Sequence, residues 1–396
     1  MFASICDLIQ LHAAFKRAQQ DNHYKHKVCS FTFHLEQNLC RLSWELRHNQ
    51  YSPQPYEYFV VREPKTRDIA APAFRDRVVH HSLVAQIQPL FEKQFIYDAY
   101  ACRVDKGTHF GAKRLKKFLM SARSIHGSQT PLYVLQCDIS KFFQSIAWDQ
   151  LIALTHATIT CPQTRDLIEK IVHTHVQNQP LQSNHPARQN CYPTFPSYLP
   201  PSQANYVPQP AKHPPLNPQL SLFDPPPPAA IPGISLKRRV GLPIGNLTSQ
   251  LFANIYLNQL DHYIKDRLRL RWYGRYMDDF YILHPDPQYL QTLTQDINAF
   301  LHTQLGLSIH PKKLTITNVR HGVPFVGYRV FYDHILIRGK TLLRMERHWR
   351  KKQKLAQKQL ITSTELAQTK AAMLGHLTHA DTYYLRQHLF AATSHK

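Results

Sequence analysis

Helical and strand-like spacing of hydrophobic residues alternates along most of the chain, with one long interruption. Apolar residues at helical spacing predict helices over residues 4–20, 34–48, 76–93, 147–176, 245–267 and 287–305, and from 341 onward. Short apolar or alternating runs predict strands over 57–62, 132–139 and 325–332, and two strands around a turn within 271–284. Because helices and strands do not alternate strictly, we expect an α+β fold.

The long interruption covers residues 177–237, which hold 16 of the 28 prolines and show almost no periodic apolar pattern. This composition is typical of an extended, polyproline-like segment that packs little. Since both flanking segments look folded, we interpret it as a flexible, disordered insertion in one folded unit. About 335 residues remain without it, a size typical of an enzyme with two or three lobes.

The charge of the chain indicates what it binds. Its 396 residues carry a formal net charge of +22, which predicts a polyanionic partner, either nucleic acid or an anionic membrane surface. The sequence has no apolar stretch of about 18 residues, and Asp7 interrupts the first apolar run, so we expect neither a membrane-spanning helix nor a secretory signal. Seven scattered cysteines without a CxxC pair argue against a disulfide framework and favour a reducing compartment.

Three aspartates lie within apolar runs, where a charge is costly unless it is paired or bound to a metal ion. Asp138 ends the predicted strand 132–139, and Asp278 and Asp279 occupy the predicted turn. Two aspartates at a turn are common on a solvated surface. The apolar flanks, together with Asp138 in a similar setting, favour a Mg²⁺ site instead. Two such ions stabilise the attacking and leaving oxygens of an in-line phosphoryl displacement.

The sequence around these aspartates resembles the reverse transcriptases, whose signature is similar to YMDD at 276–279. Further segments resemble other motifs of that family in the family's order, namely 62–84, 136–143, 241–261, 306–316 and 325–331. A YxDD match alone is weak, but a series of motifs in order is specific. The resemblance covers nearly all of the chain outside the insertion, and it implies an RNA-directed DNA polymerase with a right-hand fold.

The right-hand fold implies a division of the chain into fingers, palm and thumb. The expected boundaries are N-terminal helices and fingers over 1–130, palm over 131–176, insertion over 177–237, palm again over 238–335, and a basic helical thumb over 336–396.

The resemblance also implies roles for single residues. Asp138, Asp278 and Asp279 would be catalytic and would bind two Mg²⁺ ions, which Mn²⁺ can replace, with help from the backbone carbonyl of Ile139. The implied nucleotide-binding residues are Lys65, Arg67, Phe143, Ile244, Gly245, Asn246, Gln250 and Lys313. The implied nucleic-acid-binding residues are Arg344, Arg347, Arg350 and Lys351.

Some of these choices stay open in the sequence. Phe143 matches the aromatic residue that excludes a 2′-hydroxyl, yet either Phe142 or Phe143 belongs to the core. Lys313 matches a lysine near the leaving pyrophosphate, but Lys312 lies beside it. An exposed basic loop is an equally simple explanation for Lys65.

One block favours a subgroup of the family. Most reverse transcriptases have a glutamine before the motif glycine and a proline after its serine, where this chain has Ile244 and Gln250. This form, and residues 375–390, are similar to reverse transcriptases of diversity-generating retroelements, which copy a template RNA with frequent errors at adenines. An apolar Ile244 makes fewer fixed contacts with the nascent pair, which weakens discrimination.

That subgroup implies several partners. They are a template RNA, its RNA/cDNA duplex, dNTPs, and a small basic oligomeric accessory protein, in the cytoplasm and without a membrane. Two alternatives remain, an antiphage-defence reverse transcriptase and a non-catalytic RNA-binding or maturase-like protein. The three aspartates argue against the second alternative, because a protein that only binds RNA has no need for buried carboxylates.

Overall fold

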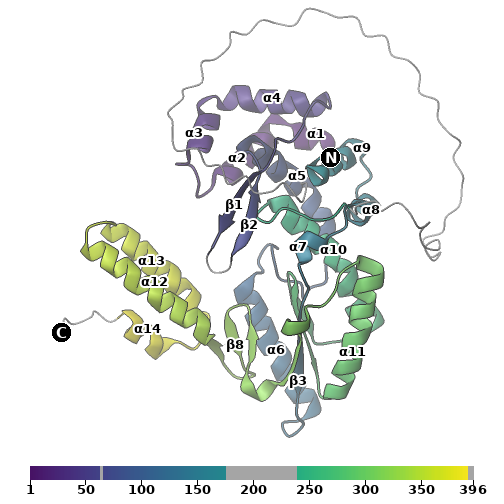
Figure 1. Cartoon of the computed structure of the whole chain (residues 1–396), viewed down its shortest axis with the longest axis vertical. Coiled ribbons are helices and arrows are strands. Elements are labelled where there is room, and N and C mark those ends of the chain that lie inside the picture. The colour runs from purple at the N-terminus through teal and green to yellow at the C-terminus, as the bar shows by residue number, and fades with distance from the viewer. Residues whose placement is uncertain (63–65, 175–238, 391–396) are drawn as a thin grey trace, which may run out of the picture. The chain divides into compact units, whose positions relative to one another are not determined.

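The protein is described by a computed structural model, which covers residues 1–62, 66–174 and 239–390. These residues belong to one unit formed by Met1–Asn178 and Arg239–Lys396. The insertion expected over 177–237 and the predicted nucleotide-binding residue Lys65 lie outside the described residues. The described part mixes helices with antiparallel sheets, which confirms the α+β class (Figure 1).

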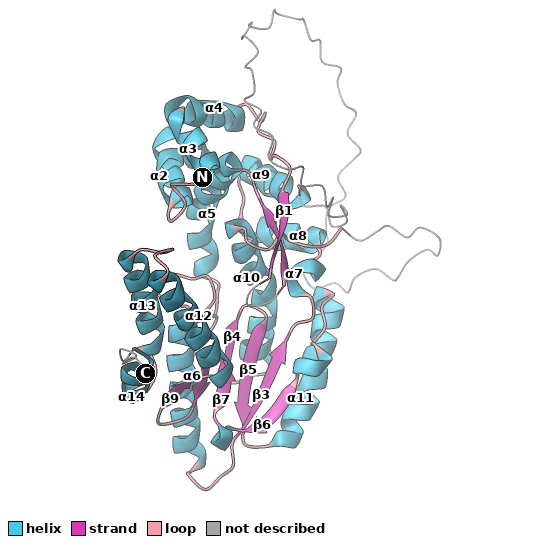
Figure 2. Ribbon diagram, turned by 60° about the vertical axis from the view of Figure 1, so that its left-hand side comes forward, coloured by secondary structure: helices cyan, strands magenta, loops and turns pink. Residues whose placement is uncertain are grey.

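A four-stranded antiparallel sheet with the order β4-β5-β3-β6 forms the centre (Figure 2). Its strands are β3 (Tyr133–Asp138), β4 (Tyr273–Tyr276), β5 (Asp279–His284) and β6 (Thr315–Asn318). The register pairs Asp138 of β3 with Asp279 of β5, and Asp279 with Tyr276 of β4. The strands predicted over 132–139 and 271–284 are therefore confirmed, and their pairing brings the three aspartates to one end of the sheet.

Helices occupy most of the remaining described chain. Those before residue 175 are α1 (Phe2–Cys6), α2 (Leu8–Gln19), α3 (His26–Phe33), α4 (Leu35–Arg47), α5 (Phe74–Glu92), α6 (Thr108–His126), α7 (Phe142–Ser145), α8 (Trp148–Thr158) and α9 (Pro162–His173). Those after residue 238 are α10 (Leu247–His262), α11 (Pro287–Phe300), α12 (Gly339–Gln357), α13 (Ser363–Leu377) and α14 (Tyr383–Phe390). Single π turns, η1 (Tyr263–Arg267) and η2 (Leu301–Leu305), extend α10 and α11.

The two faces of the central sheet bury two different cores, because successive side chains of a strand point to opposite faces. Leu135 and Ile282 pair across β3 and β5 and belong to the larger core, which α10 and α11 also line. Val134 and Leu283 pair one position away and belong to the core under α6. The near-continuous apolar sequence of β3 and β5 follows from this burial on both faces.

Two smaller sheets complete the strands. One is the hairpin of β1 (Glu57–Val61) and β2 (Arg67–Ala71), and the other has the order β7-β8-β9. The three strands of the second sheet are β7 (Val323–Phe325), β8 (Tyr328–Val330) and β9 (Ile335–Ile337). The single strand predicted over 325–332 is therefore wrong. The chain reverses at Val326 and Gly327, whose φ angles of 43° and 92° cannot continue a strand.

Two predicted helices are each divided in two. Asp7 breaks the helix expected over 4–20, because its extended backbone caps α2 and its carboxylate accepts hydrogen bonds from the amides of Ile9 (3.0 Å) and Gln10 (3.2 Å). Pro162 opens α9 within the helix expected over 147–176, and a proline fits the first turn of a helix better than its interior.

Several described elements lie outside every predicted range, namely α3, β2, α6, α7, β6 and β9. The omission of α6 is instructive, since Ala112, Leu115, Leu119 and Ala122 recur at helical spacing and are buried. The strong basic composition of that segment hid this apolar stripe.

The last three helices, α12, α13 and α14, form the basic segment that is predicted to be helical from residue 341 onward. Figures 1 and 2 show α12 and α13 side by side, and the Trp349 ring of α12 meets the Phe390 ring edge-on at 5.2 Å. The cations Arg344, Arg347, Arg350 and Lys351 are exposed on α12. Among the described helices, none has the length and apolar character needed to cross a membrane.

Candidate active site

The tight turn between β4 and β5 carries two of the three aspartates. Since Tyr276 pairs with Asp279, Met277 and Asp278 are the two central residues of the turn. Met277 has a φ of 56°, in the left-handed region that residues with a side chain seldom occupy. Such conformations persist only where the surroundings enforce them, and they concentrate at functional sites.

A buried charge network enforces the turn. The guanidinium of Arg275 donates to the backbone oxygen of Met277 at 3.0 Å and to both carboxylate oxygens of Asp261, at 2.8 and 2.6 Å. It also donates to Asn254 at 3.2 Å, and the Tyr273 hydroxyl donates to Asp261 at 2.5 Å. Burial opposes the charge of Arg275, but the Asp261 carboxylate outweighs that cost and the pKa of Arg275 is raised. The turn therefore rests on a fully buried and well-paired arginine.

Asp138 is held beside this turn by the backbone and by one cation. The amide of Ile139 donates to the carbonyl of Asp278 at 3.2 Å, and the amide of His310 donates to the carbonyl of Asp138 at 2.7 Å. His310 precedes the short 3₁₀ helix η3 (Pro311–Lys313), which carries Lys313. The ammonium of Lys313 lies 2.6 Å from the Asp138 carboxylate.

The carboxylates of the turn are poorly compensated. Burial and the nearby charge of Asp138 raise the pKa of Asp278, while Lys313 and Arg67 act in the opposite direction. Burial, a hydrogen bond with Asp138 and repulsion from Asp278 raise the pKa of Asp279 well above its usual range. One lysine does not neutralise three carboxylates, so the site favours an additional cation.

These groups open into a cavity of about 610 Å³ that collects most of the predicted site residues. The sequence-predicted residues that line it are Arg67, Asp138, Ile139, Phe143, Ile244, Gly245, Gln250, Asp278, Asp279 and Lys313. They come from β2, the ends of β3 and β5, α7, the start of α10 and η3. We call this cavity the carboxylate pocket.

Close backbone approach joins two walls of the carboxylate pocket. Gly245 has a φ of 109°, and a Cβ atom built on it would lie 3.3 Å from the Ile69 side chain of β2. A larger residue at position 245 would therefore be strained and crowded. The glycine lets the segment before α10 lie against the hairpin that carries Arg67.

The structure distinguishes the neighbours that the sequence left open. Phe142 and Phe143 both line the carboxylate pocket, but Phe142 is buried in the core and Phe143 is half-buried. Both lysines are exposed, but Lys313 contacts Asp138 and lines the pocket, whereas Lys312 does not line it.

Other predicted residues lie elsewhere. Asn246 is buried at the start of α10 and lines an adjoining cavity of about 190 Å³ with Arg77, His80 and His81. The four cations predicted to bind nucleic acid are on α12 and do not line the carboxylate pocket.

Sequence reasoning missed several residues of the site. Ile69, Lys141, Gln144 and His310 also line the carboxylate pocket. Arg275 and Asp261 lie behind it and hold the turn. A signal existed for these two, because each is a charge inside an apolar run, the same criterion that selected Asp138.

The donor set suits a hard divalent cation such as Mg²⁺. Among residues 1–62, 66–174 and 239–390, no group of three or more His, Cys, Asp or Glu side chains is arranged to hold a metal ion by itself. Mg²⁺ does not require such a group, since proteins that act on phosphates commonly hold it with one or two carboxylates and the phosphates of the substrate. Asp138 and Asp278, with the carbonyl of Ile139, fit that pattern.

Comparison with known families gives the enzyme class. Residues 232–330 match the family model described as "Reverse transcriptase (RNA-dependent DNA polymerase)". This part of the chain is therefore similar to a reverse transcriptase domain. Reverse transcriptases are RNA-directed DNA polymerases, so the family match favours an enzyme over the non-catalytic RNA-binding alternative.

Individual relatives are distant. Protein YkfC of Escherichia coli is 21% identical over 320 residues, which cover 72% of this chain and 69% of that protein. Apo telomerase from Candida tropicalis, truncated from its C-terminal domain, aligns with a TM-score of 0.44 and 11% identity over 77% of this chain. Telomerase from Candida albicans in complex with a fragment of telomeric RNA aligns with a TM-score of 0.38 and 9% identity over 80% of this chain. The chain spans only 60% and 54% of those two telomerase chains.

Proposed function

We propose that the carboxylate pocket is the polymerase site of an RNA-directed DNA polymerase that extends a primer by metal-dependent nucleotidyl transfer. The observation that carries the proposal is the convergence of Asp138, Asp278 and Asp279 with Lys313 and Arg67 on one cavity. Three carboxylates and two cations are the groups needed to hold a metal-bound triphosphate. Two Mg²⁺ ions, or Mn²⁺ in their place, would stabilise the charge that develops during phosphoryl transfer.

The side chains of the pocket have separable tasks in this proposal. Arg67 binds the triphosphate, because its guanidinium can pair with two phosphate oxygens. Lys313 holds a proton beside Asp138 and donates it to the leaving pyrophosphate. Phe143 excludes a 2′-hydroxyl by its bulk and so selects dNTPs. Ile244, Gly245 and Gln250 line the wall on which the nucleotide rests, and Lys65 would add a cation near the phosphates.

The other parts of the chain fit a right-hand polymerase. We assign β1, β2 and the N-terminal helices to the fingers, the central sheet to the palm, and the helices from α12 onward to the thumb. The exposed Arg344, Arg347, Arg350 and Lys351 would bind the phosphates of the template–primer duplex.

We further propose that the polymerase copies a template RNA with frequent errors at adenines, in the manner of diversity-generating retroelements. Ile244 supports this, since it lines the carboxylate pocket and its side chain offers the nucleotide no hydrogen bond. A small basic accessory protein would then assist in binding the RNA.

Primer extension tests both levels of the proposal. The purified chain would be given a defined RNA template, a DNA primer, dNTPs and Mg²⁺, and the products would be sequenced. We expect extension that Asp278→Asn abolishes, with misincorporation concentrated opposite template adenines. Asp296→Asn is the matched control, because Asp296 is an exposed aspartate on α11 outside the carboxylate pocket.

Each result has a defined meaning. Extension that is accurate at adenines would retain the polymerase and favour the antiphage-defence alternative. Extension that persists in Asp278→Asn would contradict the site assignment. No extension, even with cognate RNA and accessory protein present, would contradict the proposed activity.

A further inference from the structure

A second cavity lies at the end of β3 opposite to the three aspartates. It is lined by Leu132, directly before β3, and by Val319, whose amide donates to the Leu132 carbonyl at 3.0 Å. Asp138 is at the other end of this six-residue strand, and a strand of that length spans roughly 20 Å. A ligand in this cavity is therefore separate from the chemistry of the carboxylate pocket.

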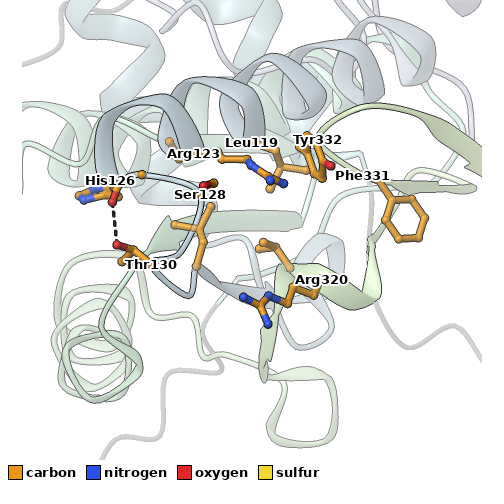
Figure 3. Close-up of a pocket in the computed structure, with 12 residues that line it drawn as sticks. Leu119, Arg123, His126, Ser128, Thr130, Arg320, Phe331 and Tyr332 are labelled. Atoms are coloured by element: carbon orange, nitrogen blue, oxygen red, sulfur yellow. Dashed lines mark hydrogen bonds between the residues drawn. The ribbon is translucent and has the colours of Figure 1, made fainter.

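The inner walls of this cavity are apolar (Figure 3). Leu119 and Ala122 come from the last turns of α6, Leu132 and Val319 from the edge of the sheet, and Phe331 from the loop between β8 and β9. Its volume is about 150 Å³. An apolar protein cavity of about that volume accommodates one benzene ring, so a single planar ring fits here. We call it the distal cavity.

Two arginines border the distal cavity. The guanidinium of Arg123 lies over the Tyr332 ring, 3.9 Å from its centroid, and Figure 3 shows these side chains together at one edge. Arg320 comes from the other wall and is exposed. Among the described residues, neither arginine forms an ion pair and no acidic side chain lines the cavity. The mouth therefore carries uncompensated positive charge.

The remaining polar groups do not oppose an anion there. The Thr130 hydroxyl donates to the His126 carbonyl at 2.6 Å, which satisfies one of the free carbonyls at the end of α6 (Figure 3). The exposed Tyr332 ring offers a second surface for stacking beside the cavity. The apolar cavity has room for one ring, which matches a nucleotide base. The two guanidinium groups at its mouth match the phosphate of that nucleotide.

We propose that the distal cavity binds one unpaired nucleotide of an RNA, with the base against Leu119, Leu132 and Phe331 and the phosphate on Arg123 and Arg320. Unpaired bases stack on aromatic and apolar side chains, whereas paired bases are not available for insertion. The inference extends the proposed function, because it gives RNA a second contact remote from the template–primer in the carboxylate pocket. An acidic peptide is the competing occupant.

The test compares RNA with and without bases. Fluorescence anisotropy would measure binding of a labelled 12-nucleotide oligouridylate and of an abasic oligomer of equal length, with a saturating RNA–DNA primer–template present. Stacking of one base contributes about 1–3 kcal/mol, so we expect the base-bearing oligomer to bind the wild-type protein about tenfold more tightly. In Arg123→Gln/Arg320→Gln both affinities should fall, with the base preference below about threefold.

Two further variants separate the contributions of charge and cavity. Lys16→Gln/Arg17→Gln removes the same charge from exposed positions at the end of α2 and should keep the tenfold base preference. Ala122→Leu fills the buried wall of the distal cavity and should remove the preference for bases without weakening binding of the abasic oligomer. Primer extension on a short template should stay unchanged in every variant, and a failure of the proposed function would instead show as no extension by the wild-type protein.

Three outcomes would overturn the proposal. Equal affinity of the wild-type protein for the two oligomers would mean that only phosphates are attracted. Retention of the base preference in Arg123→Gln/Arg320→Gln would place the base elsewhere. The third outcome comes from competition. If excess uridine monophosphate displaces neither oligomer but a glutamate-rich peptide containing tyrosine displaces them, the distal cavity would be assigned to a protein partner.

Discussion

Two groups of charges lie on either side of the same turn and are arranged in opposite ways. Behind the turn, Arg275 and Asp261 are fully buried and saturate each other with hydrogen bonds. In front of it, Asp138, Asp278 and Asp279 share one partly exposed lysine, and their mutual repulsion helps to raise the pKa of Asp278 and of Asp279. The first arrangement holds the backbone in position, and the second leaves negative charge available for a ligand.

This difference separates structural from functional charge in the protein. A buried ion pair with every donor used stabilises a particular backbone conformation, here the strained Met277. Carboxylates that repel each other cost stability, and they are retained where a cation or a reaction needs them. Variants on the two sides of the turn should therefore affect different properties.

The largest expected effect is on catalysis, in Asp138→Asn. Asparagine preserves the shape of the side chain but removes the charge, so primer extension should fall about 10²–10³-fold, as expected when a group that stabilises transition-state charge is removed. The free energy of unfolding should change by less than about 1 kcal/mol, because the pair with Lys313 is partly exposed. Denaturant titration beside the extension assay measures both. Loss of activity through unfolding of the variant would contradict the functional assignment.

The largest effect on stability should follow from Arg275→Met. Removing one partner leaves Asp261 charged and buried, which typically costs about 3–5 kcal/mol. The double variant Arg275→Met/Asp261→Leu removes both charges and should recover part of that loss. Urea denaturation of the single and double variants provides the measurement. Equal stability of Arg275→Met and the wild type would show that the network does not hold the turn.

The contrast between the two charge groups also explains what the sequence could predict. Asp138, Asp278 and Asp279 were found because the short strands around them are strongly apolar, and the same pattern predicted β3, β4 and β5. The register that brings them together is a long-range property that strand periodicity alone does not determine. Arg275 and Asp261 were missed, since a pattern shows a buried charge but not the partner that satisfies it.

Local turns were the other source of error. Gly327 reverses the chain between β7 and β8, and Asp7 begins α2. Each single residue overrides an apolar run that extends across it. The motif resemblance supplied the candidates Phe143, Gly245 and Lys313, which periodicity would not have selected. Their positions around one cavity came only from the structure.

A buried group without any charged partner gives an intermediate effect. His80 is buried, and burial together with nearby His81 and Arg77 lowers its pKa from about 6.5 to about 3. Its neutral form is the one that fits the folded state, so this stability is complete above pH 6.5 and declines as the pH falls toward 3. Between pH 7 and pH 5 the contribution should decrease by about 2 kcal/mol.

The variant His80→Leu tests this linkage. Between pH 7 and pH 5, the free energy of unfolding of the variant should decrease by about 2 kcal/mol less than that of the wild type. Urea denaturation at both pH values measures the two decreases. Each protein is compared at pH 5 with itself at pH 7, so a change in stability that the substitution causes at both pH values cancels. An identical pH dependence in the variant and the wild type would contradict the burial of a neutral imidazole.

The smallest expected effect is a gain in stability from Asp279→Asn in the absence of divalent cations. Neutralising one carboxylate relieves its repulsion with Asp138 and Asp278. The gain should stay below about 1 kcal/mol, because Asp279 keeps exposed surface through which water screens the repulsion, although surrounding atoms partly desolvate its carboxylate. Mg²⁺ should then raise the melting temperature of the wild type more than that of the variant, since ligand binding to the folded state stabilises it. Differential scanning fluorimetry with and without Mg²⁺ measures both shifts. If Asp279→Asn is instead less stable than the wild type without Mg²⁺, the carboxylates in front of the turn are compensated as fully as Arg275 and Asp261 behind it. That result would contradict the contrast between the two groups of charges.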